Sequence, residues 1–204
     1  MNWLAHLLLS EPTPEFRLGS ILPDLVPSAV LAALPAEFQQ GIRRHQRIDA
    51  YTDAHALFRL SVQRINPPYR RFGGILIDVF YDHFLARDWH SFSDVPLPRF
   101  ADEVYASFTA RYSDIPPDAR QPLQRMQAEN WLYSYHEIEG IAAALSRISS
   151  RFRRPFDLAP SLLLLERDYE LFHSDFSAFF PQLSTYVRSG SPLPRNGVSS
   201  SGRS

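Results

Sequence analysis

A polar patch interrupts an apolar helical stripe in the segment that begins near residue 38. After Phe38 and Ile42, the next positions on the same helical face are His45, Asp49 and Thr52. A carboxylate buried without a partner costs several kcal/mol. We therefore expect these polar side chains to be hydrogen-bonded, ion-paired or bound to a cation.

A second segment repeats this pattern about thirty residues later. Ile75 and Leu85 bracket Asp78 and Asp82 on one helical face, and His83 adjoins Asp82. One divalent cation satisfies several carboxylates at once, so a metal is the simplest explanation for the two polar stripes.

Two further residues could join the same site. Asp24 lies where Pro23 and Pro27 interrupt an apolar segment, and His6 lies on an apolar first helix. The chain contains no cysteine, which excludes thiolate zinc sites, disulfides and cysteine nucleophiles. A metal would therefore be held by nitrogen and oxygen ligands alone.

All 21 basic residues are arginine, so Schiff-base chemistry and a P-loop lysine are excluded. The net charge of −1 argues against general nucleic-acid binding. Arginine is concentrated between positions 43 and 71, with a smaller cluster at 151, 153 and 154. Arg43, Arg44 and Arg47 flank His45, and we expect them to bind a phosphate or an acidic protein. The alternatives are a solvated helix face or buried salt bridges to the acids of the two stripes.

The spacing of apolar residues predicts an all-α fold, a single compact helical domain of seven or eight helices over residues 1–188. Residues 189–204 are rich in Ser, Gly, Pro and Arg and are predicted to form a solvated tail. We interpret Trp131 and Tyr135 as core side chains rather than ligand-stacking ones. The expected helices span 2–9, 35–65, 74–89, 98–111, 118–135, 137–152 and 157–187, with a broken apolar segment from 15.

The longest apolar run, from Ala29 to Leu34, is far too short to cross a bilayer, and the first residues lack a basic leader. We therefore predict a soluble cytoplasmic protein without a membrane partner. No oligomeric state is predicted.

Several motifs, taken in order, resemble the acyl carrier protein phosphodiesterase family over residues 1 to about 187. They are Met1-Asn2-Trp3-Leu4-Ala5-His6-Leu7, Gly19-Ser20-Ile21-Leu22-Pro23-Asp24, Gly41-Ile42, His45-Gln46-Arg47-Ile48-Asp49, Thr52-Asp53, Asp78-Val79 and Asp82-His83-Phe84-Leu85. Trp3 departs from the Phe or Tyr that is more usual there. The Asp82-His83 pair reverses the doublet that names the HD phosphohydrolase superfamily, which this family resembles.

The resemblance implies an all-helical, HD-phosphohydrolase-like, metal-dependent hydrolase. Such an enzyme removes 4′-phosphopantetheine from holo acyl carrier protein by metal-activated water and leaves the apo form. Manganese is favoured, with magnesium or iron(II) as alternatives.

Carried over by position, the resemblance also implies a set of site residues. Asp24, His45, Asp78 and Asp82 are ranked first for direct contact with the metal. His6 and Asp49 rank second, and His83 is the candidate acid/base. Arg43, Arg44 and Arg47, chosen because they flank His45 and not from the resemblance, are the candidate substrate-binding residues.

Two other functions stay open from the sequence. One keeps the metal chemistry but acts on nucleotides or other small phosphodiesters. The other is a non-catalytic helical module that binds an acidic protein through its arginines and holds the buried acids in salt bridges.

Overall fold

The computed structural model describes residues 1–190, which form twelve α-helices and five short 3-10 helices and contain no strand. The all-α prediction is confirmed, but the predicted number of helices was too low. The α-helices are α1 (Trp3–Leu8), α2 (Pro14–Ile21), α3 (Ser28–Ala32), α4 (Ala36–Ala54), α5 (Ala56–Gln63), α6 (Gly73–Arg87), α7 (Leu97–Ala110), α8 (Pro117–Ala128), α9 (Trp131–Ser134), α10 (Ile138–Ser149), α11 (Leu162–Arg167) and α12 (Tyr169–Ser189). The 3-10 helices span Leu22–Asp24, Arg70–Phe72, Trp89–Ser91, Tyr112–Asp114 and Ala159–Ser161.

Three of the predicted helices are shorter or divided in the structure. The helix expected over 35–65 breaks at His55, which has an extended ψ of 134° and caps α5 by accepting a hydrogen bond from the amide of Leu57. The helix expected over 118–135 breaks at Asn130, which adopts a left-handed φ of 46°. The last predicted helix begins only at Leu162 and is divided at Asp168. Apolar periodicity continues across these breaks, so the prediction of uninterrupted helices was wrong there.

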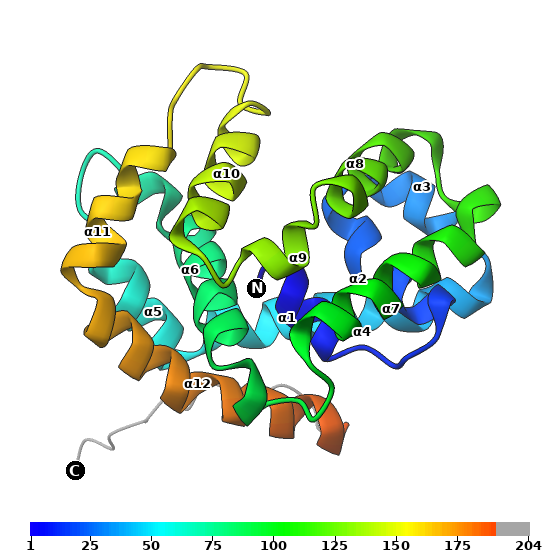
Figure 1. The fold of residues 1–204 in the computed structure, drawn as a ribbon, viewed down its shortest axis with the longest axis horizontal. Helices are drawn as coiled ribbons and strands as arrows, with labels where there is room; N and C mark the ends of the chain where they lie inside the picture. The colour runs from blue at the N-terminus through cyan, green and yellow to red at the C-terminus, as the bar shows by residue number, and fades with distance from the viewer. Residues whose placement is uncertain (191–204) are drawn as a thin grey trace, which may run out of the picture.

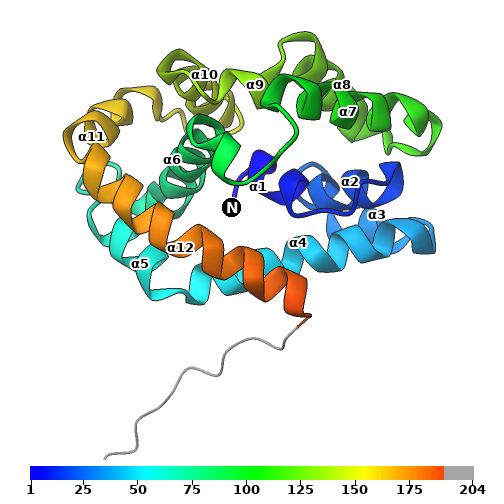
Figure 2. The same ribbon diagram turned by 60° about the horizontal axis from the view of Figure 1, so that its bottom comes forward.

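The helices gather on two sides of α1 and α9 (Figure 1). Helices α5, α6, α10 and α11 lie on one side, and α2, α3, α7 and α8 lie on the other, while α12 extends beneath α1 from the first side toward the second. Figure 2 shows that α12 runs alongside α4 and α5, and it packs against α4, α5 and α6. The short helix α1 contacts both α2 and α6, so residues on α1 face both groups.

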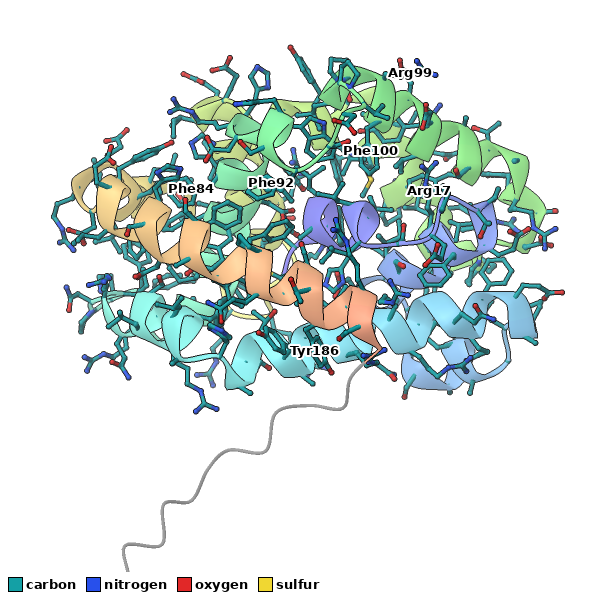
Figure 3. The ribbon with its side chains drawn as sticks, turned by 90° about the horizontal axis from the view of Figure 1, so that it is seen from below. Arg17, Phe84, Phe92, Arg99, Phe100 and Tyr186 are labelled. Carbon is teal, nitrogen blue, oxygen red and sulfur yellow. The ribbon has the colours of Figure 1, made fainter. Side chains whose placement is uncertain are left out.

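Aromatic side chains fill the space between α12 and its neighbours. Phe92 lies with its ring centroid 5.8 Å from that of Phe176 and 5.0 Å from that of Phe180. Figure 3 shows Phe84 and Phe92 beside α12, and the Phe84 ring centroid is 5.8 Å from that of Phe176. On the other side, Arg17 of α2 lies with its guanidinium 5.7 Å from the ring centroid of Phe100 on α7. These contacts join the helices around α1 into one core.

Two glycines allow α2 and α4 to touch along their backbones. A Cβ on Gly19 would collide with the carbonyl oxygen of Phe38, and a Cβ on Gly41 would collide with that of Phe16. Only residues without a Cβ permit this approach. The close packing places Ser20, at the end of α2, against the middle of α4.

The predicted tail of residues 189–204 falls outside the described residues, apart from its first two members. Ser189 ends α12, and Gly190 follows with a left-handed φ of 66°, a common helix stop. Within the described part of the chain, no helix combines the length and the apolar character that crossing a membrane requires.

Candidate metal centre and adjoining cavity

The polar stripe expected on residues 38–52 is confirmed on α4. Phe38, Ile42, His45 and Thr52 are buried, and Asp49 is half-buried. The stripe on α6 differs at its start, because Ile75 is 37% exposed and faces a cavity rather than the core. Helix α1 lies over the polar part of both stripes and brings His6 to them.

His6, His45 and Asp49 form the centre of the site. Nε2 of His6 lies 3.1 Å from Oδ1 of Asp49, and Nε2 of His45 lies 2.9 Å from Oδ2 of the same carboxylate. The two imidazole rings stack with centroids 4.0 Å apart. Nδ1 of His45 donates to the carbonyl oxygen of Ser20 at 2.8 Å. That bond fixes the ring and directs Nε2 into the cluster, as in metal-ligating histidines generally.

The charges of the cluster favour an ionised acid beside a neutral histidine. Burial alone would raise the pKa of Asp49, but hydrogen bonds from His45 and His6 and the Met1 ammonium outweigh burial and lower it. Burial lowers the pKa of His6, which favours the neutral form that ligates metals. Burial also acts to lower the pKa of His45, but its bond to Asp49 and the nearby Asp24 raise it overall.

Two more predicted acids adjoin this cluster. Oδ1 of Asp24 lies 3.7 Å from Nε2 of His45, and its Oδ2 accepts a hydrogen bond from the indole nitrogen of Trp3 at 2.8 Å. The α-amino nitrogen of Met1 lies 3.3 Å from Oδ1 of Asp49 and 3.0 Å from Oδ1 of Asp78. A cationic group thus already lies between two of the carboxylates.

The carboxylate of Asp82 is hydrogen-bonded to the backbone of α1. It accepts hydrogen bonds from the amide of Leu4 at 2.8 Å and from that of Ala5 at 3.2 Å. Burial raises the pKa of Asp82 to about 7 despite these two bonds. In this arrangement Asp82 caps the first turn of α1 and positions the helix that carries His6.

The structure does not bring His83 to the cluster. Its Nδ1 donates to the carbonyl oxygen of Tyr135 at 2.9 Å, and its Nε2 lies 3.2 Å from the hydroxyl of Tyr169. It lines a separate cavity with Arg87 and His136. One residue along a helix is a turn of about 100°, so a neighbour of Asp82 faces another direction.

The three arginines predicted to bind substrate also point elsewhere. Arg43 is exposed. Arg44 donates to the carbonyl oxygen of Leu9 at 2.8 Å and lines a different cavity, and Arg47 lies 5.1 Å from the ring centroid of Tyr186. None of the three lines the cavity next to the metal cluster.

That cavity has a volume of about 230 Å³ and opens beside Asp24 and Asp78. Its basic residues are Arg147 on α10 and Arg151 just after it. Arg151 belongs to the smaller arginine cluster noted in the sequence, whereas Arg147 was not singled out. Their spacing of four residues, which places side chains on one helical face, is the signal that could have found them.

The residues present fit a divalent metal. Among the described residues, His6, His45 and Asp49 each offer a ligand atom, and these atoms lie within 4.8 Å of one another. Nδ1 of His6 is buried without a hydrogen-bond partner in the described part of the chain. A nitrogen and oxygen donor set suits manganese, magnesium or iron(II). The cluster joins His45, which was ranked first, to His6 and Asp49, which were ranked second.

Comparisons with known proteins identify the family. A model of the family described as acyl carrier protein phosphodiesterase matches residues 1–183. A protein of that name from Enterobacter sp. (strain 638) is 31% identical over 189 residues, which cover 92% of this chain and 98% of the relative. One from Klebsiella pneumoniae (strain 342) is 33% identical over 184 residues, covering 90% and 95%. No solved structure matches, so the likeness to HD phosphohydrolases stays a prediction. The chain belongs to the acyl carrier protein phosphodiesterase family.

Proposed function

We propose that this chain hydrolyses the phosphodiester between 4′-phosphopantetheine and a serine of holo acyl carrier protein and releases the apo carrier. As a member of its family, the chain is a hydrolase. The observation that carries the proposal is the cluster of His6, His45 and Asp49, which lies beside a cavity lined by Asp24 and Asp78. The reaction would take place in the cytoplasm, which stays a prediction from the sequence.

We assign the metal to His6, His45 and Asp49, with Asp24 as a fourth ligand. Manganese is our first choice. Iron(II), which imidazole ligands suit, and magnesium, which prefers oxygen ligands, are the alternatives. A divalent ion there would polarise the phosphoryl group and lower the pKa of water by several units. Asp82 is not assigned as a ligand, since both of its oxygens accept backbone amides.

The protein's own groups hold these ligands in position. The carbonyl of Ser20 orients the ring of His45, and the indole of Trp3 holds the carboxylate of Asp24. Asp82 anchors α1 and thereby His6. Ligands fixed in this way lose little conformational entropy when a cation binds.

The leaving serine oxygen needs a proton, and Asp78 is the best placed donor. Its carboxyl group lines the cavity, and burial raises its pKa to about 6. A protonated fraction of Asp78 is therefore present near neutral pH and can transfer its proton to the serine oxygen. A positioned acid of this kind contributes roughly 10²- to 10⁴-fold in rate. This assignment replaces His83, which lines another cavity.

Mass spectrometry of the carrier tests the proposal. Purified protein is incubated with holo acyl carrier protein and Mn²⁺, and the expected result is loss of the phosphopantetheine mass from the carrier. EDTA and the variant Asp49→Asn should each abolish that loss, and Arg99→Gln, at an exposed position on α7, serves as a control. An unchanged carrier beside a cleaved small phosphodiester, such as a nucleotide, would overturn the assignment of substrate.

A further inference from the structure

Arg147, Trp131, Trp3 and Arg151 form a continuous stack along one wall of the cavity. The guanidinium of Arg147 lies 4.0 Å from the ring centroid of Trp131. The indoles of Trp131 and Trp3 are stacked with centroids 5.7 Å apart and planes 8° apart, and Arg151 lies 5.8 Å from the ring centroid of Trp3. The sequence had suggested Trp131 only as a core residue, and it is both 3% exposed and part of the wall.

The guanidinium of Arg147 is held in place but incompletely paired. Its Nη1 lies 3.9 Å from Oε2 of Glu129, which is beyond hydrogen-bond distance. Its Nη2 is buried and has no hydrogen-bond partner among the described residues. Burial lowers the pKa of Arg147, and Tyr135 and Glu129 offset only part of that effect. A partly buried cation with an unsatisfied donor is stabilised by an anion that can accept from it.

The cavity therefore has an acidic side and a basic side. Asp24 and Asp78 adjoin the metal cluster, and Arg147 and Arg151 line the same space of about 230 Å³. Ile75, Val79 and Ile148 supply apolar surface between the charged groups. Such a combination suits an anion attached to a flexible, partly apolar chain.

We propose that Arg147 and Arg151 bind the phosphate of the phosphopantetheine group, with the Trp131–Trp3 wall lying along its organic arm. The inference rests on the proposed function for the identity of the arm. A planar guanidinium donates two parallel hydrogen bonds to two phosphate oxygens. Arg147, stacked on a buried indole, is fixed before the phosphate arrives and loses little side-chain freedom on binding. Arg151 is exposed at the cavity rim and would guide the anion inward.

The chain offers a matched control for Arg147 in Arg125. Arg125 lies 6.0 Å from the same Trp131 ring, but it does not line the cavity and it pairs with Glu129 at 3.1 Å. Arg147→Gln and Arg125→Gln thus each remove one of the two guanidinium groups that lie near the Trp131 ring. Arg147→Lys retains the charge without the planar donor pair.

Titration calorimetry of the full chain with 4′-phosphopantetheine, pantetheine and inorganic phosphate tests this inference. We expect Arg147→Gln to weaken binding of phosphopantetheine and phosphate by about 10- to 100-fold and to leave pantetheine binding unchanged. Arg147→Lys should lose less, and Arg125→Gln should match the parent protein. Circular dichroism and Mn²⁺ affinity, unchanged in all variants, would show that the fold and the metal centre are intact.

Distinct results separate this inference from the proposed function. The parent protein could leave holo acyl carrier protein uncleaved while Arg147→Gln binds phosphate more weakly than the parent does. That result would support the anion site and refute the proposed reaction. Equal binding of phosphopantetheine by the parent protein and by a folded Arg147→Gln would overturn the anion site. So would the absence of phosphate binding to the parent protein at millimolar concentration.

Discussion

Replacing Gly41 with alanine should separate the two helices that hold His45. A Cβ at Gly41 would meet the carbonyl oxygen of Phe16 and the amide nitrogen of Ser20, which are backbone atoms of α2. Backbone atoms cannot rotate aside as a side chain can, so α2 must move away from α4. The hydrogen bond from Nδ1 of His45 to the carbonyl oxygen of Ser20, now 2.8 Å long, should then weaken.

Two opposing contributions set the change in stability. Alanine within a helix is favoured over glycine by about 1 kcal/mol. Overpacking a closely fitted contact costs about 1–3 kcal/mol, and the upper part of that range applies because both colliding atoms are backbone. We expect Gly41→Ala to lower the free energy of unfolding by about 1–2 kcal/mol, which corresponds to a fall in Tm of about 2–8 °C for a chain of this size.

Gly74 provides the control, because it also lies in a helix and a Cβ there meets no atom within 4 Å. Gly74→Ala should raise the free energy of unfolding by up to about 1 kcal/mol. Urea denaturation followed by circular dichroism measures both variants. Calorimetry should show that Gly41→Ala binds Mn²⁺ about 10- to 100-fold more weakly, as expected for loss of a group that orients a ligand. A Gly41→Ala protein as stable as Gly74→Ala, with the parent's metal affinity, would refute the reasoning.

Four further outcomes follow from the site. Asp49→Asn should bind Mn²⁺ about 100-fold or more weakly by calorimetry while its circular dichroism stays helical, since a central anionic ligand is lost; unchanged affinity would remove Asp49 from the metal centre. Asp82→Ala should lower the free energy of unfolding in urea by about 2–4 kcal/mol, because two buried amides lose their acceptor; a loss below about 1 kcal/mol would contradict that role. Asp78 must carry its proton to act as the acid, and burial raises its pKa to about 6. We therefore expect kcat to fall as the pH rises above this value. Asp78→Asn should remove this fall from the pH–rate profile. Arg44→Gln should leave KM within about twofold in steady-state assays, because Arg44 donates to the carbonyl of Leu9 outside the cavity; a large rise in KM would return it to the substrate site.

The polar stripe on α4 could be predicted because it depends only on local geometry. Side chains three and four residues apart on a helix share a face, so a buried His45 beside Asp49 requires a partner whatever the rest of the fold does. The same rule placed Asp78 and Asp82 on one face of α6, whereas the meeting of that face with the α4 site depends on helix packing. It could not show that Asp82 is satisfied by the amides of Leu4 and Ala5, since that contact joins residues 77 and 78 positions apart.

Two helix breaks could not be predicted from the spacing of apolar residues. At Asn130 the helix ends because this residue adopts a left-handed backbone conformation, which is uncommon for residues other than glycine. The spacing of apolar residues does not reveal it. The break at His55 depends on a side-chain cap to Leu57. The break at Asn130 matters for the site, because Trp131 follows it directly and stacks on Trp3.

The arginines show where nearness along the chain is misleading. Arg43 and Arg47 are each two residues from His45, a rotation of about 200° around the helix, so they must face away from whatever His45 faces. Helical geometry alone argues against their contact with a ligand of the metal centre. Arg147 and Arg151 are about a hundred residues away in sequence and reach the cavity because α10 packs on α6. Arg43 and Arg47 lie on the helix that carries His45 and Asp49, whereas helix packing determines which cations face the cavity.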